Sequence, residues 1–172
     1  MNHSKKTIEK FLEETYHLKT LIRYNNTPRL LNESIAEHMY YVALIVYKLY
    51  EFYTFDLSVA LKIALFHDIP EIYLSDMPSN TKKMFPEMKK AVQDNQKKAS
   101  DLIDPTMTPF IEQYETQSSS EAKIVKLADL LSVIQYTSVE ASLGNKYMDR
   151  ICKSTKILVD EMYTQIDKEM GS

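Results

Sequence analysis

The sequence is poor in the residues that turns and cross-links depend on. It has two glycines, Gly144 and Gly171, and a single cysteine, Cys152, in 172 residues. Sheets and hairpins usually need several glycines for their turns, so this scarcity favours helices throughout. One cysteine excludes a disulfide within the chain and is typical of a reducing compartment. We therefore expect an all-α, cytoplasmic protein in which Cys152 is a passive helix residue.

A strong net charge and a long apolar run are also missing. The formal net charge is −3, and the lysines are scattered among glutamates. This pattern gives no basic surface for a nucleic-acid polymer. No run approaches the ~20 apolar residues of a membrane span, the densest being Val42 to Val46. We expect neither a nucleic-acid polymer nor a membrane as partner, which leaves a small molecule.

Apolar side chains recur at three- and four-residue steps, which predicts a helical bundle of about six to eight helices in one domain. Two capping boxes, Ser34–Glu37 and Ser118–Glu121, and a cap at Asp56 mark helix starts. The charged helix after Pro86 is read as a solvated face rather than a lid over a pocket. The predicted helices cover about residues 4–24, 35–53, 57–66, 70–74, 86–103, 107–114, 119–143 and 146–168.

One apolar segment ends abruptly in a histidine beside an aspartate, His67-Asp68. A buried charge is costly unless it is paired or bound to a metal, so this pair needs a partner. His38 and Asp129, each in a helical pattern of its own, are candidates to complete a site for a divalent cation. Two imidazoles and two carboxylates suit Mn²⁺, Co²⁺, Fe²⁺, Ni²⁺ or Zn²⁺ better than Mg²⁺.

The other two histidines do not support a second metal. His3 lies in a terminal segment that is expected to fray, and His17 is expected on the surface of the first helix. The sequence therefore predicts one divalent transition metal per chain.

The ordered set His38, His67-Asp68 and Asp129 resembles the H…HD…D signature of the HD-domain phosphohydrolases, which are all-helical proteins. A wider set of residues is similar to the YfbR-like 5′-deoxynucleotidases over about residues 18 to 136. This wider set comprises Arg23, Glu33–His38, His67-Asp68 with Glu71, Asp76-Met77-Pro78 with Lys82, and Lys126–Leu131. The resemblance implies a single HD domain over residues 1–172, with a C-terminal helix at about 146–168 packing on the bundle. It also implies a nucleotide substrate and a homodimer or higher homo-oligomer.

The resemblance also implies roles for residues around the metal. Glu71 would be a general acid or base, and Asp76 would lie near the sugar and the nucleophilic water. Arg23 would bind the phosphate, as would Lys82, although Lys83 beside it could serve equally. Without the resemblance, Glu71 is a glutamate at a helix start, Asp76 an Asx turn and Arg23 a solvated arginine at a helix end.

One position departs from the family pattern. The family usually has tryptophan after the arginine, against the 2′ position of the sugar, whereas this chain has Tyr24. The activity implied is removal of the 5′-phosphate from (deoxy)nucleoside monophosphates by a metal-activated water. Two alternatives remain open: a deoxynucleoside triphosphate triphosphohydrolase of the same family, and a non-catalytic helical module with a structural metal.

Overall fold

The expected all-α class is confirmed. The computed structural model describes residues 2–77, 81 and 84–170. In this part of the chain there is no β-strand, and one isolated antiparallel bridge joins Ile22 to Ser34. The helical elements are α1 (Asn2–Tyr16), η1 (His17–Lys19), α2 (Ile35–Leu49), α3 (Leu57–Phe66), α4 (Glu71–Leu74), α6 (Pro86–Ile103), α7 (Thr108–Thr116), α8 (Ser120–Ser142) and α9 (Lys146–Met170).

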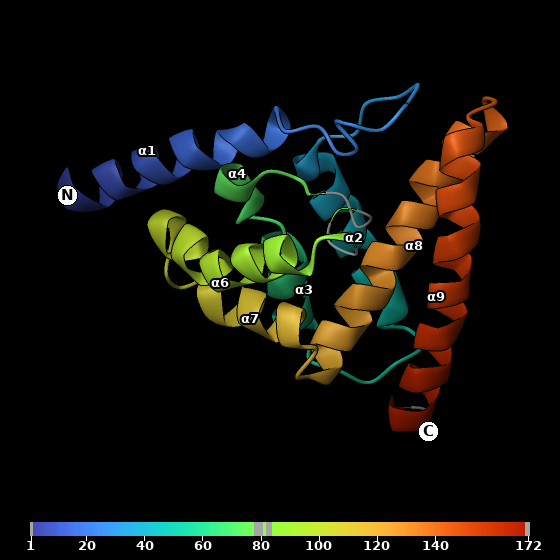
Figure 1. Cartoon of the computed structure of the whole chain (residues 1–172). Helices are drawn as coiled ribbons and strands as arrows, with labels where there is room; N and C mark the ends of the chain where they lie inside the picture. Colours follow the sequence, from blue (N-terminus) through green and yellow to red (C-terminus); the bar gives the residue numbers. More distant parts are fainter. Residues whose placement is uncertain (1, 78–80, 82–83, 171–172) are drawn as a thin grey trace.

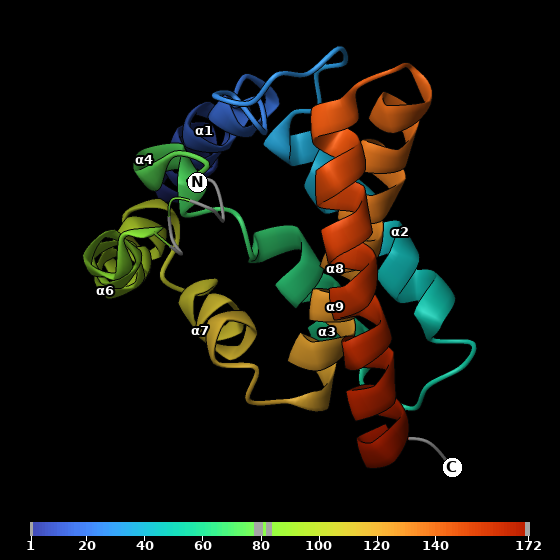
Figure 2. The same cartoon turned by 45° about the vertical axis from the view of Figure 1, so that its right-hand side comes forward.

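The two longest helices, α8 and α9, run side by side, and α1 extends away from the other end of the molecule (Figure 1). Turned by 45°, the same arrangement places α2 and α3 against α8, with α7 and α6 farther out (Figure 2). The main core is formed by α2, α3, α8 and α9, where apolar side chains such as Val46, Ile63 and Leu127 are fully buried. Burial of this kind is the dominant favourable term in folding.

A smaller apolar cluster lies beside the main core and ties the N-terminal segment to the bundle. Leu18 of η1, Ile35 and Met39 of α2, and Ile111 of α7 are buried in it. Because Ile35 and Met39 flank His38 on α2, this cluster also fixes the start of the helix that carries His38.

Two predicted helix starts are confirmed. The Ser34 hydroxyl accepts the Glu37 N–H at 3.2 Å, and Glu37 Oε2 accepts the Ser34 N–H at 2.7 Å, which is a complete capping box. The Asp56 carboxylate accepts the Val59 N–H at 3.1 Å and so begins α3. These local contacts fix where α2 and α3 begin, and hence where His38 and the end of α3 lie.

The first helix is shorter than predicted. It ends at Tyr16 and continues only as η1 to Lys19, instead of reaching Tyr24. The backbone beyond it pairs with the segment before α2: the Arg23 N–H donates to Glu33 O, and the Ile35 N–H to Leu21 O, both at 2.9 Å. Groups used in this pairing are not available for a helix, and residues 24–33 form a closed loop.

The second predicted capping box is wrong. Ser119, not Ser118, caps α8 and accepts the Ala122 N–H at 3.1 Å. Glu121 does not reach back to its own helix start, because its carboxylate accepts the Asp56 N–H at 2.9 Å. Tertiary contact with α3 therefore overrides the local pattern.

The C-terminal part follows the prediction closely. Gly144, with a φ of 98°, closes α8 in the left-handed region that favours glycine. The next helix, α9, packs along α8. Cys152 is a free thiol buried on α9. No helix in the described ranges combines the length and the apolar character needed to cross a membrane.

Candidate metal centre and adjoining cavity

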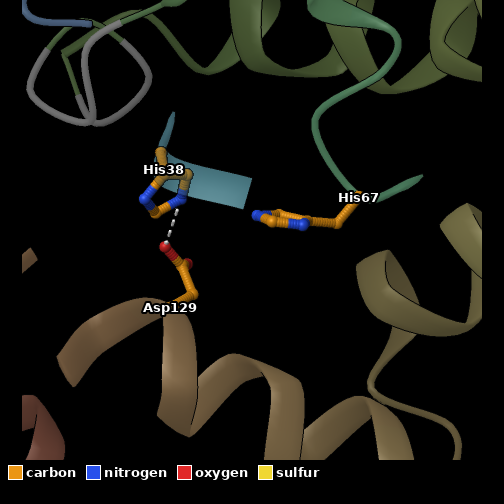
Figure 3. Close-up of side chains that lie close together, drawn as sticks. All are labelled: His38, His67 and Asp129. Atoms are coloured by element: carbon orange, nitrogen blue, oxygen red, sulfur yellow. Dashed lines mark ion pairs between the residues drawn. The ribbon is translucent and has the colours of Figure 1, made fainter. Parts of the chain in front are cut away.

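Three helices bring the predicted ligands together. His38 lies in the first turn of α2, His67 caps the C-terminus of α3 and is followed by Asp68, and Asp129 lies in the middle of α8. Figure 3 shows His38, His67 and Asp129 pointing toward one another from separate elements. A ligand atom of each of these three lies within 4.8 Å of the others, and all three residues are buried.

The separations are close to those of ligands that share one ion. His38 Nε2 lies 3.3 Å from Asp129 Oδ1, and Asp68 Oδ2 lies 3.6 Å from His38 Nε2 and 3.4 Å from His67 Nε2. Two atoms that are each about 2.1 Å from one ion lie roughly 3.0 to 3.4 Å apart in octahedral or tetrahedral geometry. Asp68 therefore adjoins the compact group of three, although its side chain is more exposed than theirs.

The His67 ring is oriented so that one of its nitrogens can bind a metal. Its Nδ1 lies 2.9 Å from the carbonyl oxygen of Ala64, which can only accept a hydrogen bond. Nδ1 must therefore carry the proton, and Nε2 presents a lone pair. The Nε2 atoms of both His67 and His38 are buried without a hydrogen-bond partner. Such atoms are rare in folded proteins unless something else binds them, so the donor set fits a divalent transition metal.

His38 has two neighbours at its other nitrogen. Nδ1 lies 3.1 Å from Ser132 Oγ on α8 and 2.9 Å from Arg23 Nη1. Burial, and next the Arg23 guanidinium, lower the pKa of His38. The imidazole is therefore neutral at physiological pH, the form in which histidine binds metals.

Asp129 is oriented by two residues that share one of its oxygens. Oδ2 accepts the Tyr114 hydroxyl at 2.6 Å and the Lys126 ammonium at 2.8 Å, which leaves Oδ1 on the side of His38. Burial alone would raise the pKa of Asp129, but Lys126 and the two histidines lower it well below its usual range. The carboxylate is thus ionised and presents one oxygen to the site.

This arrangement predicts an effect of Tyr114 on metal affinity. Replacing Tyr114 by phenylalanine keeps the ring against His67 and removes only the hydroxyl that fixes Asp129. Because partners of this kind orient ligating carboxylates, we expect metal affinity to fall by about 10- to 100-fold. Metal-chelator competition measures the change, and Tyr163→Phe on α9 is the control. An unchanged affinity in Tyr114→Phe would show that Lys126 alone orients Asp129.

A cavity of about 490 Å³ opens on the side of the bundle that carries the predicted metal ligands. Its lining includes His67, Asp68 and Asp129, and it continues along α9 past Tyr147 and Ile151. Two residues of α6, Val92 and Gln96, also line it, while most of α6 is exposed. The volume lies within the range of small-molecule sites, about 300–1,000 Å³.

Glu71 and Asp76 both line this cavity. Glu71 is the first residue of α4, three positions after Asp68, and is partly buried. Asp76 Oδ2 accepts the backbone N–H of Tyr24 at 2.9 Å across the cavity wall, a contact between residues far apart in the chain. Asp76 thus ties the segment after α4 to the loop after Arg23.

Arg23 and Tyr24 line the cavity as well, and the Tyr24 backbone lies against Asp76. Arg23 Nη1 is 2.8 Å from Glu33 Oε2, and the guanidinium carbon lies 5.3 Å from the centre of the Tyr24 ring. The Arg23 side chain is largely buried rather than solvated at a helix end. Lys82 and its neighbour Lys83 lie outside the described residues, and their role stays a prediction.

Several side chains at the site were not singled out for these contacts from the sequence. Lys126 and Ser132 lie one turn before and one turn after Asp129 on α8, so helical spacing could have indicated both. Tyr114 and Glu33 reach the site from other elements. No spacing in the sequence could have indicated these two.

Comparison with known proteins identifies the family. A family model described as an HD domain matches residues 15–167. The 5′-deoxynucleotidase HDDC2 of Danio rerio is 31% identical over 124 residues, which cover 65% of this chain and 60% of that protein. The protein of the same name from Homo sapiens is 27% identical over 152 residues, covering 84% of this chain and 73% of that one.

A solved structure shares the fold. The HD-domain phosphohydrolase lin2634 from Listeria innocua superimposes with a TM-score of 0.76 at 18% identity, over 92% of this chain and 82% of that one. At this identity the likeness concerns the fold alone. The chain spans about three fifths of the length of the Danio rerio relative, 60%.

Proposed function

The chain belongs to the HD-domain family, and on this basis we propose that it is a metal-dependent phosphohydrolase that removes the 5′-phosphate from deoxynucleoside monophosphates. Two relatives are named 5′-deoxynucleotidases, which supports the substrate class. The observation that carries the proposal is a pair of buried, unbonded histidine nitrogens beside a carboxylate, at the edge of a cavity that also holds Glu71 and Arg23.

We propose His38, His67, Asp68 and Asp129 as the residues that would hold the metal. When bound there, a divalent cation supplies Lewis-acid chemistry, which polarises a phosphoryl oxygen and makes water nucleophilic at neutral pH. The protein fixes the orientation of the side chains that would bind the metal. The Ala64 carbonyl contacts Nδ1 of His67, and the Ser132 hydroxyl contacts Nδ1 of His38. The Tyr114 hydroxyl donates to Asp129.

Glu71 is proposed as the general acid or base. Its position three residues after Asp68, in the lining of the cavity, lets it serve the reacting centre without being a ligand. In the reaction, water attacks phosphorus, the bond to the 5′ oxygen breaks, and a proton must reach that oxygen. Asp76 is proposed to lie near the sugar and the water, at the edge where it accepts the Tyr24 N–H.

Arg23 is proposed to bind the phosphate, and its contact with His38 supports this role. If His38 is a ligand through Nε2, its proton sits on Nδ1, where Ser132 Oγ can accept it. A guanidinium cannot donate to a protonated nitrogen. We therefore expect Arg23 to turn from His38 toward an anion in the cavity, while its pairing with Glu33 keeps it at the edge.

Replacing Arg23 by alanine should lower kcat/KM and raise KM. A charge-assisted contact to phosphate is worth about 1.5–3 kcal/mol, so we expect a loss of about 10- to 100-fold. Arg23→Lys should recover only part of this loss, because lysine keeps the charge but cannot donate the two parallel hydrogen bonds of a guanidinium. Steady-state kinetics on a deoxynucleoside monophosphate provide the measurement, and Arg150→Ala, at an exposed position on α9, is the control. Wild-type kinetics in Arg23→Ala would argue against a phosphate contact.

Tyr24 is proposed to form the wall against the 2′ position of the sugar. Its ring lines the cavity beside Arg23, so a phosphate bound by Arg23 would bring the sugar close to this ring. An aromatic wall disfavours the ribose by leaving no room for its 2′-hydroxyl, which is selectivity by repulsion.

A phosphate-release screen tests the proposed function. Metal-free protein is loaded in turn with Mn²⁺, Co²⁺, Fe²⁺, Ni²⁺ and Zn²⁺ and incubated with deoxy- and ribonucleoside mono- and triphosphates. Inorganic phosphate from deoxynucleoside monophosphates is the expected product. Release of tripolyphosphate from triphosphates would favour a triphosphohydrolase instead. No turnover with any metal would favour a non-catalytic module with a structural metal.

We further propose that residues 1–172 form one domain. The C-terminal helix α9 packs along α8, which carries Asp129, and its side chains line part of the cavity. The family match to residues 15–167 extends well beyond the 18–136 stretch that carried the resemblance.

A further inference from the structure

We infer that Tyr136 on α8 is a positioning residue that holds the Tyr24 ring in place and thereby sets the selectivity between deoxyribose and ribose. The inference rests on the proposed function, since it concerns the sugar at the same site. Tyr136 is absent from the cavity lining and lies behind Tyr24. Its effect would therefore pass through Tyr24 rather than through contact with the substrate.

The two tyrosine rings are stacked. Their centres lie 5.4 Å apart, and the ring planes differ by only 3°. Tyr136 is buried on the long helix α8, whereas Tyr24 belongs to the loop that connects Arg23 to α2. Aromatic pairs at this separation attract each other beyond the burial of their area. A rigid helix thus supports one face of a ring that belongs to a loop.

The hydroxyl of Tyr136 secures the same loop at a second point. It donates to the Leu31 carbonyl oxygen at 2.8 Å. One turn further along α8, the fully buried carboxylate of Glu140 accepts the backbone N–H of Leu30 at 2.9 Å and that of Leu31. Asn145 donates to Glu140 at 2.7 Å and to the Pro28 carbonyl at 2.9 Å. The loop is therefore held by α8 through its backbone as well as through the stacked ring.

The buried Glu140 carboxylate accepts hydrogen bonds from these groups and, at 3.5 Å, from the Tyr136 hydroxyl. Burial alone would raise the pKa of Glu140, but the hydrogen bonds from the Leu30 N–H, Asn145 and the Leu31 N–H lower it. An ionised carboxylate that accepts several N–H bonds makes stronger contacts than a neutral acceptor would. This explains how a ten-residue connection with no helix of its own is fixed.

Tyr24 itself has a backbone conformation that needs such support. Its φ is 55°, in the left-handed region that non-glycine residues rarely adopt. Its N–H donates to Asp76, and its carbonyl accepts from Arg29 Nη1 at 2.9 Å. The backbone of Tyr24 is thus fixed within the loop, and the stacked Tyr136 ring restricts its side chain. A wall that excludes one hydroxyl group must be held to within a fraction of an ångström, so its support decides selectivity.

Tyr136→Leu removes the ring and tests the inference. The expected result is a fall of about threefold to tenfold in the ratio of kcat/KM for a deoxyribonucleoside over the matched ribonucleoside monophosphate, because the stacking is lost. Metal content should stay at the wild-type value. Tyr136→Phe keeps the ring and loses only the hydroxyl with its bonds to Leu31 and Glu140, so its ratio should fall less. Tyr163→Leu, at a half-buried position on α9, is the control and should leave the ratio unchanged.

A double mutant separates positioning from general destabilisation. In a Tyr24→Ala background, Tyr136→Leu should change the ratio no further, because the wall it supports is gone. A ratio that stays at the wild-type value in both Tyr136→Leu and Tyr136→Phe, in an enzyme that turns over nucleotides, overturns the inference alone. A ratio that falls by the same factor with and without the Tyr24 ring also overturns it. If the wild-type protein hydrolyses no nucleotide, the proposed function fails first, and the role in selectivity fails with it.

Discussion

Replacing Asp129 by alanine should strip most of the metal from the purified protein. The substitution removes the carboxylate whose Oδ1 lies 3.3 Å from His38 Nε2, and it leaves the Lys126 ammonium and the Tyr114 hydroxyl without their shared acceptor. Loss of a residue that only orients a ligand weakens metal binding by about 10- to 100-fold, and loss of a ligand should exceed this. Elemental analysis after gel filtration should give about one divalent metal per wild-type chain and far less in the variant.

His67→Ala provides an independent test from another helix. Its Nε2 is buried without a hydrogen-bond partner, so the substitution removes no hydrogen bond of that atom. Asp160→Ala, on the exposed face of α9, is the matched control and should keep the wild-type metal content. Wild-type stoichiometry in both Asp129→Ala and His67→Ala would refute this metal site. Circular dichroism of each variant separates metal loss from unfolding.

Glu71→Ala should abolish most turnover while the metal stays bound. General acid or base catalysis contributes about 10²- to 10⁴-fold, and we expect kcat to fall by a factor in this range. Glu71 lines the cavity beside His67 and Asp68 but is not one of the three clustered ligands. A fall in kcat with unchanged metal content is the signature that distinguishes this role from that of a ligand.

Glu71→Gln refines the test because glutamine keeps the size and polarity but loses the charge and the ability to transfer a proton. We expect it to be nearly as slow as Glu71→Ala. Glu112→Gln, at an exposed position on α7, is the control. Turnover at the wild-type rate in Glu71→Gln would reassign Glu71 to a purely structural role at the start of α4. Metal loss in Glu71→Ala would instead place it among the ligands.

The sequence predicted the fold class because the responsible interactions are local. The apolar spacing, the scarcity of glycine and the caps at Ser34 and Asp56 all act within a few residues, and the structure has the helices they indicate. The same holds for the end of α8 at Gly144. Even so, tertiary contacts overrode two local patterns. Backbone pairing with residues 33–35 shortened the first helix, and contact with Asp56 drew Glu121 away from its own helix start.

By itself, the sequence indicated which residues could ligate a metal, because histidines and aspartates recur in an order that resembles a known metal-binding signature. The tertiary structure decided how they are held. The hydrogen bond from Tyr114 to Asp129 joins α7 to α8. The stacking of Tyr136 on Tyr24, and the bond from the Tyr136 hydroxyl to Leu31, join α8 to a loop more than a hundred residues earlier. Contacts between distant parts of the chain depend on how helices pack, and packing follows from the shape of the whole core rather than from any periodicity in one segment.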